Sequence, residues 1–238
     1  MGDAVSPDDL ARPSLLPCPS PHLHRVRVGG PVPGLTSLRA ALAAGRPERL
    51  GQFGAAPAGA RQASVLVLLS DESSPTVLLT ERSQGLRSHA GQISFPGGGL
   101  EVGETAVAGA LREAEEEVGL PAGLVEPIGC LPTAWVPVSG YEVTPVVASW
   151  RDPVELVPND PGEVAGVMRL PLDRLADPAS RVTASLPGGY RGPAFESGEW
   201  FIWGFTAHLL DVILSLGGWG LPWDRDRVRS VPGRFLRD

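Results

Sequence analysis

ETAVAGALREAEEEVGL, residues 104–120, has the apolar periodicity of one amphipathic helix. At 100° per residue, the side chains of Glu113, Glu116 and Glu117 share an arc of about 100°. The neighbouring arc is apolar and contains Val107, Ala110, Leu111, Ala114 and Val118. The sequence therefore predicts a helix from about residue 104 to 118 that buries one stripe and lines up three carboxylates beside it. Gly119 and Pro121 end this helix.

Three carboxylates this close repel one another unless cations neutralise them. Oxygen ligands at this spacing suit Mg²⁺ or Mn²⁺. An exposed acidic helix face is the simpler interpretation, and the helix alone does not exclude it. Its surroundings favour a site. The segment FPGGG at 95–99 allows a backbone to approach a metal or a phosphate, and Arg112 could orient a carboxylate.

The same residues match the Nudix box, glycine-x5-Glu-x7-Arg-Glu-aliphatic-x-Glu-Glu-x-Gly-aliphatic. The matching residues are Gly98, Glu104, Arg112, Glu113, Glu116, Glu117, Gly119 and Leu120. The one departure is Ala114, where a larger aliphatic residue is usual. The chain thus resembles the Nudix hydrolase family. This resemblance implies an α/β protein, a Nudix-type α/β/α sandwich with a mixed sheet between helices, that cleaves diphosphates with Mg²⁺ or Mn²⁺.

The resemblance also implies roles for individual residues. Glu113 and Glu117 are expected as the main metal ligands, with the Gly98 carbonyl as another. Glu116 is expected as a further ligand or as the general base. Arg112 is expected to hold a glutamate in place, with Glu104 as a supporting or additional metal group. A downstream glutamate could instead be the base, and the alternatives are Glu155, Glu163 and Glu196.

The segment before the box indicates a substrate. LLTERSQGLRSHAGQISFPGG, residues 78–98, resembles the signature LLTxRSxxLRxHxGQxxFPGG of the coenzyme A diphosphatase subfamily. This implies cleavage of coenzyme A, or of an acylated or oxidised form, to 3′,5′-ADP and 4′-phosphopantetheine. The substrate-binding residues it implies are Arg82, Arg87, Gln92, Gly97 and Gly98. The alternatives are a diphosphatase for ADP-ribose or NADH, and a non-catalytic binding module.

Composition is consistent with an enzyme for small anionic molecules. The 238 residues include 20 basic ones, all of them arginine, so any cationic phosphate contact must be made by arginine. The lack of lysine excludes Schiff-base chemistry, a P-loop and a kinase-type phosphate lysine. The net charge of −7 argues against a nucleic-acid partner. Trp219 and Trp223 could cover a core edge or contact a second subunit, which leaves a homodimer possible.

Location and redox state follow from what the sequence lacks. No run reaches the roughly 18 apolar residues of a membrane span, and the N-terminus has no signal core, so a cytoplasmic protein is expected.

Cys18 and Cys130 stand apart from any CxxC or Cys/His cluster. Two reduced thiols are therefore expected, rather than a disulfide or a zinc site.

Two regions are predicted along the chain. Residues 1–59 form an N-terminal arm, partly loosely ordered, with a short helix at 35–44, and residues 60–238 form the Nudix hydrolase domain. Strands are predicted at 63–69, 76–81, 125–131, 142–150 and 163–170. A helical turn is predicted at 172–175 and a last helix at 203–216. This order predicts a mixed sheet with helices on both faces.

Overall fold

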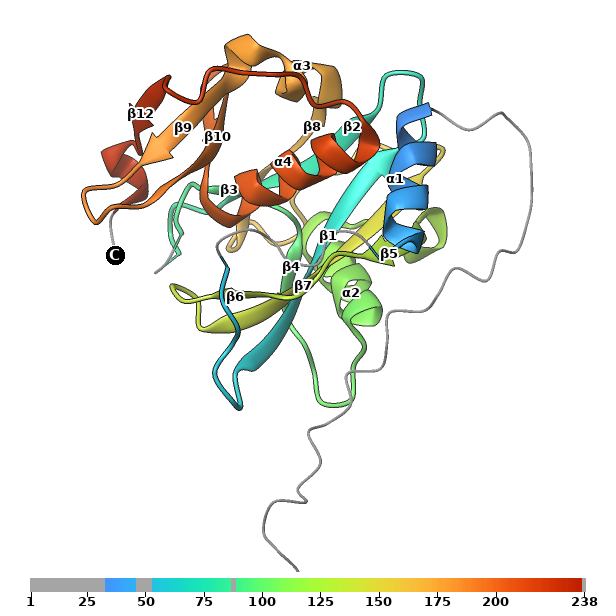
Figure 1. Ribbon diagram of the computed structural model, residues 1–238. Helices are drawn as coiled ribbons and strands as arrows, with labels where there is room; N and C mark the ends of the chain where they lie inside the picture. The colour runs from blue at the N-terminus through green and yellow to red at the C-terminus, as the bar shows by residue number, and fades with distance from the viewer. Residues whose placement is uncertain (1–32, 46–52, 87–88, 237–238) are drawn as a thin grey trace, which may run out of the picture.

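The computed structural model describes residues 33–45, 53–86 and 89–236 (Figure 1). Its α-helices are α1 (Pro33–Ala43), α2 (Ala106–Val118), α3 (Leu172–Ala176) and α4 (Gly204–Gly217). Short 3₁₀ turns lie at Ala122–Leu124, Pro178–Ser180 and Gly233–Phe235. The strands are β1 (Arg61–Ser70), β2 (Thr76–Arg82), β3 (Ile93–Ser94), β4 (Gly97–Gly99), β5 (Glu126–Cys130), β6 (Ala134–Val136), β7 (Tyr141–Trp150), β8 (Val164–Pro171), β9 (Arg181–Ser185), β10 (Arg191–Ser197), β11 (Trp200–Ile202) and β12 (Val228–Ser230).

The main sheet is mixed, as predicted. Its central path runs β3-β2-β1-β7-β5, with β4 on β1, β6 on β7 and β8 on β2. Strands β1 and β7 are parallel, from Arg61 opposite Tyr141 to Ser70 opposite Trp150. The pairs β1–β2, β2–β8 and β5–β7 are antiparallel. The five longer predicted strands are confirmed, with ends that differ by one or two residues.

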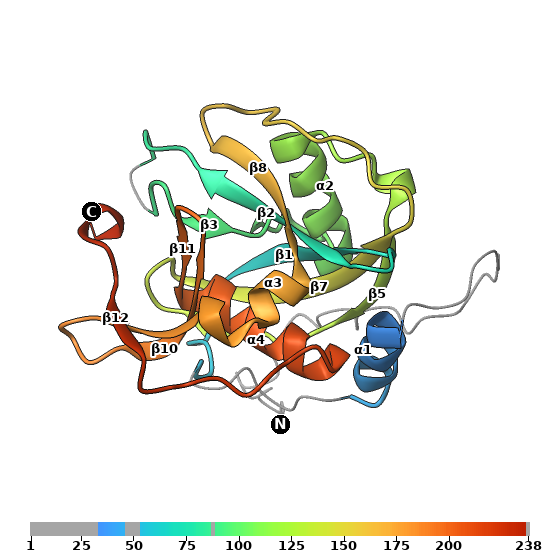
Figure 2. The ribbon, with the colours of Figure 1, turned by 90° about the horizontal axis from the view of Figure 1, so that it is seen from above.

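Both faces of this sheet are buried. Leu66 and Leu68 of β1 join a core formed with α2, whereas Val67 and Leu69 point the other way and join a core formed with α1 and α4. Figure 2 shows α2 on one side of the sheet and α1 and α4 on the other. Alternation of side chains along a strand explains this division. The α/β/α sandwich with a mixed sheet is therefore confirmed.

Helix α2 begins two residues later than predicted because Thr105 is its N-cap. The Thr105 side chain accepts a hydrogen bond from the Ala108 backbone N–H at 3.2 Å. Gly119 ends the helix in the left-handed conformation, with φ of 67°. The predicted stripe packs as expected: Ala110 and Ala114 are fully buried, so the small residue at 114 is accommodated.

A second sheet was not predicted. It has the order β11-β10-β9-β12, with β9, β10 and β11 antiparallel and β12 parallel to β9. Its small core consists of Val182, Ala184, Ala194, Phe201, Val231 and Phe235. Strand β10 contains Gly192 and Pro193, residues that weaken a strand prediction, and β12 lies far along the chain. The last helix, predicted at 203–216, is confirmed as α4, and Phe201 and Ile202 just before it lie in β11.

The predicted helix at 35–44 is confirmed as α1, and it is part of the core. Leu35 and Leu38 are buried, and α1 contacts α4 and β5. Of the arm predicted for residues 1–59, the structure describes 33–45 and 53–59. Cys130 at the end of β5 is disulfide-bonded, so the reduced thiol predicted there is wrong; sequence spacing alone does not fix the redox state of a thiol. Cys18 lies outside the described residues.

Candidate active site

Strand β4 brings a glycine backbone against α2 and β1. A Cβ on Gly97, whose φ is 156°, would lie 2.3 Å from the Ser64 carbonyl oxygen. A Cβ on Gly98 would lie 2.5 Å from the carboxylate of Glu113. At Gly97 the nearest obstacle is backbone, so this position requires glycine, whereas at Gly98 a side chain would have to displace the flexible carboxylate of Glu113. The backbone of β4 thus forms one wall of the site, and α2 forms the facing wall.

Arg112 is the centre of a hydrogen-bond network in this site. Its Nε and Nη2 donate to the two carboxylate oxygens of Glu104, at 2.9 and 3.1 Å. Its Nη1 donates to Glu113 at 2.9 Å and to Glu116 at 3.0 Å, and Nη2 also donates to the Gly99 carbonyl at 3.0 Å. One guanidinium therefore binds three carboxylates and links α2 to β4. This pairing lowers the pKa of Glu104 and raises that of Arg112.

Glu117 is the most buried of the carboxylates, with 4% of its surface exposed. Its Oε2 accepts a hydrogen bond from the Gly97 N–H at 3.3 Å. Burial raises the pKa of Glu117 to about 8, against the opposing effects of Arg82 and of this hydrogen bond. Burial also raises the pKa of Glu113. The site therefore holds acidic groups whose negative charge is poorly compensated.

Exposure differs among the three glutamates on the edge of α2. The Glu113 and Glu116 side chains are 15% and 60% exposed, whereas Glu117 is buried. Across the part of the chain that the structure describes, no three His, Cys, Asp or Glu side chains already form a metal-binding group. In this arrangement Glu113 and Glu116 are bonded to Arg112, and Glu117 turns to Gly97.

These residues nevertheless fit a divalent cation. They offer carboxylate oxygens, which Mg²⁺ and Mn²⁺ prefer, and a cation would supply the positive charge that the buried acids lack. The close approach of Gly98 to Glu113 also keeps the backbone within reach of the same group. Glu113, Glu116, Glu117 and the Gly98 carbonyl could therefore hold such an ion after a local rearrangement.

Arg82, at the end of β2, lies beside this acidic group. Its charge is near enough to Glu117 to lower the pKa of that carboxyl. Its Nε is buried and donates to no acceptor among the described residues. Strand pairing with β8 shifts register between Glu81 and Arg82, which alters the local direction of the strand. A buried guanidinium N–H without an acceptor is able to donate to an anionic oxygen.

The other predicted substrate residues are distributed around β3 and the preceding turn. Gln92 Nε2 donates to the Phe235 carbonyl at 3.3 Å, and its Oε1 lies 3.3 Å from His89 Nδ1. His89 has a positive φ of 59°, so this turn is held in an uncommon conformation for a non-glycine residue. The Gln92 amide thus connects the signature segment to the C-terminal part of the chain. Arg87 lies outside the described residues.

The three alternative base residues have different surroundings. Glu163 is exposed, and its charge raises the pKa of both Glu113 and Glu117, so it lies near them. Glu196 forms ion pairs with Arg227, just before β12, at 2.7 Å and with Arg229 of β12 at 3.4 Å. Glu155 is exposed. Of the three, Glu163 is therefore the one that the structure brings to the carboxylates of α2.

Asn159 is a contributor that the sequence did not reveal. Its backbone N–H donates to the Glu117 carbonyl at 2.8 Å, and its side-chain amide donates to the Glu116 carbonyl at 3.1 Å. Ser83 N–H in turn donates to the Glu163 carbonyl at 2.8 Å. The Asn159 bonds fasten the loop that carries Glu163 to the end of α2, and the Ser83 bond fastens it to the end of β2. An asparagine in a Pro-Asn-Asp-Pro-Gly turn carries no signal for this contact.

Comparison with known proteins identifies the family. The NUDIX domain model matches residues 60–186. An Escherichia coli O7:K1 protein described as an uncharacterized Nudix hydrolase, NudL, is 38% identical over 168 residues, which cover 66% of this chain and 83% of the relative. An Escherichia fergusonii protein with the same description is 46% identical over 119 residues, covering 47% and 58%. The chain belongs to the Nudix hydrolase family, and it is a diphosphate-cleaving hydrolase.

Solved structures include two similar Nudix hydrolases. RenU from M. smegmatis is 22% identical with a TM-score of 0.48, covering 69% of this chain and 90% of that one. A Nudix hydrolase from Nitrosomonas europaea is 17% identical with a TM-score of 0.44, covering 72% of this chain and 80% of that one.

Within the described residues, no helix has both the length and the apolar character needed to cross a bilayer.

Proposed function

We propose that this protein is a coenzyme A diphosphatase that requires Mg²⁺ or Mn²⁺. It would cleave coenzyme A, or an acylated or oxidised form, to 3′,5′-ADP and 4′-phosphopantetheine or its derivative. The observation that carries the proposal is the segment 78–98, which resembles the coenzyme A signature and runs directly into the Nudix box. Arg82 in this segment has a buried Nε without an acceptor, next to the acidic residues.

The position of Arg82 supports the proposal that the substrate carries several phosphates. Coenzyme A carries a diphosphate and a separate 3′-phosphate, so it needs more cationic contacts than a simple diphosphate. In a chain without lysine, arginines must supply them. Arg82 is suited to the diphosphate because its charge lies beside Glu117. Arg87, five residues further on, would serve another phosphate, and Gln92, Gly97 and Gly98 would line the same path.

The residues of α2 would bind and position the reacting groups. The metal would be held by Glu113, Glu117, Glu116 and the Gly98 carbonyl. Arg112 would fix the positions of the Glu113 and Glu116 carboxylates through its hydrogen bonds. The bound metal would lower the pKa of a water molecule and neutralise charge on the phosphates. Arg112 supports this arrangement because it already links both glutamates to β4.

Water would attack one phosphorus of the diphosphate, the anhydride P–O bond would break, and the second phosphate would leave with the electron pair. A carboxylate would accept the proton that the water loses. Glu116 is our first choice for this base because it is the most exposed of the three glutamates. Glu163 is the second, since its charge acts on Glu113 and Glu117.

Product analysis tests the proposal. The purified protein is incubated with Mn²⁺ and, separately, with coenzyme A, ADP-ribose and NADH, and the products are weighed by mass spectrometry. Formation of 3′,5′-ADP and 4′-phosphopantetheine from coenzyme A, at higher kcat/KM than for the other two, supports it. Preferred cleavage of ADP-ribose or NADH would assign the enzyme to a different diphosphate. Failure to cleave any of the three would contradict an enzymatic role on these substrates.

A further inference from the structure

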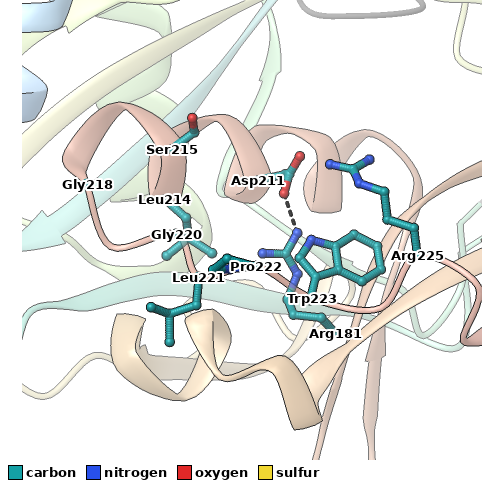
Figure 3. A pocket seen from close by; sticks show the side chains of 10 residues that line it. All are labelled: Arg181, Asp211, Leu214, Ser215, Gly218, Gly220, Leu221, Pro222, Trp223 and Arg225. Carbon is teal, nitrogen blue, oxygen red and sulfur yellow. Dashed lines mark hydrogen bonds and ion pairs between the residues drawn. The ribbon is translucent and has the colours of Figure 1, made fainter.

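A cavity of about 490 Å³ lies on the opposite side of the main sheet from the carboxylates of α2. It lies between the C-terminal half of α4, the start of β9 and the segment 218–225 (Figure 3). No residue that lines it belongs to the candidate active site. Its volume is in the range of cavities that bind small molecules. The cavity therefore needs an explanation separate from diphosphate cleavage.

Arg181 provides a buried positive charge at this cavity. Only 2% of its surface is exposed, and its guanidinium lies 4.5 Å from the ring centre of Phe195 and 4.6 Å from that of Trp223. One Nη donates to Asp211, whereas the buried Nε has no acceptor among the described residues. A single carboxylate therefore leaves part of this guanidinium unsatisfied.

Arg225 adds a second positive charge at the cavity. Its guanidinium lies 5.1 Å from the ring centre of Trp223, and the residue is exposed. Figure 3 shows Trp223 between the two arginines and Asp211 bonded to Arg181 alone. Among the residues that line the cavity, two guanidinium groups stand against one carboxylate; Asp224 and Asp226, which flank Arg225 in the sequence, are not among the lining residues. A bound anion would balance the positive charge of this lining.

The other end of the cavity is apolar. Leu214, Leu221 and Pro222 line it, and Leu221 is 52% exposed although it is a large apolar residue. Figure 3 shows Leu214 and Leu221 at the end away from Arg225. A ligand that fills both ends therefore needs an anionic group and an apolar body.

We propose that this cavity binds a small molecule that carries an oxyanion, a phosphate or a carboxylate, on an apolar body. The oxyanion would accept hydrogen bonds from the guanidinium of Arg225, whose planar donors suit such groups. The buried positive charge of Arg181 would add electrostatic attraction. Trp223 would cover the ligand beside the arginines, and the apolar body would pack on Leu214 and Leu221. This site is distinct from the one that cleaves diphosphates.

Calorimetric titration of the metal-free protein tests the proposal with four probes. Phenyl phosphate and benzoate each combine an oxyanion with a ring, benzyl alcohol lacks the charge, and inorganic phosphate lacks the ring. We expect phenyl phosphate or benzoate to bind with a Kd on the order of 1 mM or lower. Benzyl alcohol and inorganic phosphate should bind at least about tenfold more weakly. The tighter of the two anions identifies the oxyanion preferred.

Variants locate the binding. Arg225→Ala should weaken the tighter probe at least about tenfold, and Leu221→Glu should do so by repulsion. Arg191→Ala, which removes an exposed arginine outside the cavity, should leave the Kd unchanged. Arg82→Ala should also leave it unchanged. Binding that depends on Arg82 and not on Arg225 would place the anion in the active site and overturn the proposal. The proposal would also be overturned if neither aromatic anion bound at about 10 mM, a concentration well above the expected Kd.

Discussion

The carboxylate of Glu113 occupies the space that a side chain on Gly98 would need: a Cβ there would lie 2.5 Å from Glu113 Oε1. Helix α2 and strand β4 are therefore fitted to each other at this point. A methyl group on residue 98 must displace the carboxylate, because the nearest atoms of Glu113 are those that carry its charge. The identity of residue 98 consequently sets the position of a candidate metal ligand.

Gly98→Ala should reduce kcat/KM by about 10²-fold, because misplacement of a reacting group by about 1 Å has effects of that size. The mutant should still fold, since Glu113 is able to turn toward solvent. Gly123→Ala is the matched control: no atom lies within 4 Å of a Cβ there, and its activity should be unchanged. Near-normal activity of Gly98→Ala would show that the position of Glu113 is not critical.

Arg112→Lys tests whether the fork of the guanidinium matters or only its charge. A lysine cannot bind both oxygens of Glu104 while it also reaches Glu113 and Glu116. We expect kcat to fall about 10²-fold and the free energy of unfolding to fall by about 1–3 kcal/mol. Activity assays and urea unfolding measure the two effects. If Arg112→Lys retained full activity, the hydrogen-bond geometry would be irrelevant.

The helix and its acidic edge were predictable because their signal is local. Periodicity at 3.6 residues and a glycine C-cap act within 17 residues of sequence. The three layers were also predictable, since β1 is apolar at consecutive positions and must be buried on both faces. The second sheet was not, because β12 pairs with β9 across more than 40 residues, β11 and β12 have three residues each, and β10 contains Gly192 and Pro193.

The site could be predicted only as a set of residue types. Spacing placed Glu113, Glu116 and Glu117 on one edge, but it could not show that Glu117 is buried and Glu116 open. That difference depends on packing of α2 against β4. Nor could spacing show that Asn159 fastens a distant loop to α2, since the contact joins residues more than 40 positions apart.

Metal binding should stabilise the protein through the glutamates of α2. Mn²⁺ at about 100 times its Kd would add about 2.7 kcal/mol to the free energy of unfolding, and EDTA should reverse it. Glu117→Gln should abolish most of the increase in Tm. Glu115→Gln, a change to an exposed neighbour on the same helix, should retain it. An equal rise in Tm for both variants would mean that the ion binds elsewhere.

His208 should make stability depend on pH. Burial lowers its pKa, against the opposing effects of Asp211 and of its hydrogen bond to the Gly204 carbonyl, and its ring packs on Phe53 and Tyr190. A histidine whose folded pKa is depressed contributes stability above its ordinary pKa of about 6.5, and this stability is lost as the pH falls through that value and the folded pKa. His208→Gln should therefore lose less Tm than the wild type between about pH 7.5 and 5.5.

The free energy of unfolding is therefore measured against pH for both proteins, and the difference between the two slopes isolates the contribution of His208. Glu113 and Glu117 titrate in both proteins, so their effects cancel in the difference between wild type and His208→Gln. The maximal change in slope expected for one group is about 1.4 kcal/mol per pH unit. Parallel curves would indicate that His208 remains accessible to protons in the folded state.

The identity of the general base can be decided between Glu116 and Glu163. A glutamine keeps the size of the side chain but accepts no proton at neutral pH, so replacing the base should lower kcat by about 10² or more with a smaller effect on KM. If Glu116→Gln has this effect and Glu163→Gln does not, Glu116 is the base. The opposite result assigns the proton to Glu163, which acts on Glu113 and Glu117 from a loop held by Asn159. If neither change lowers kcat, the proton is accepted by another group.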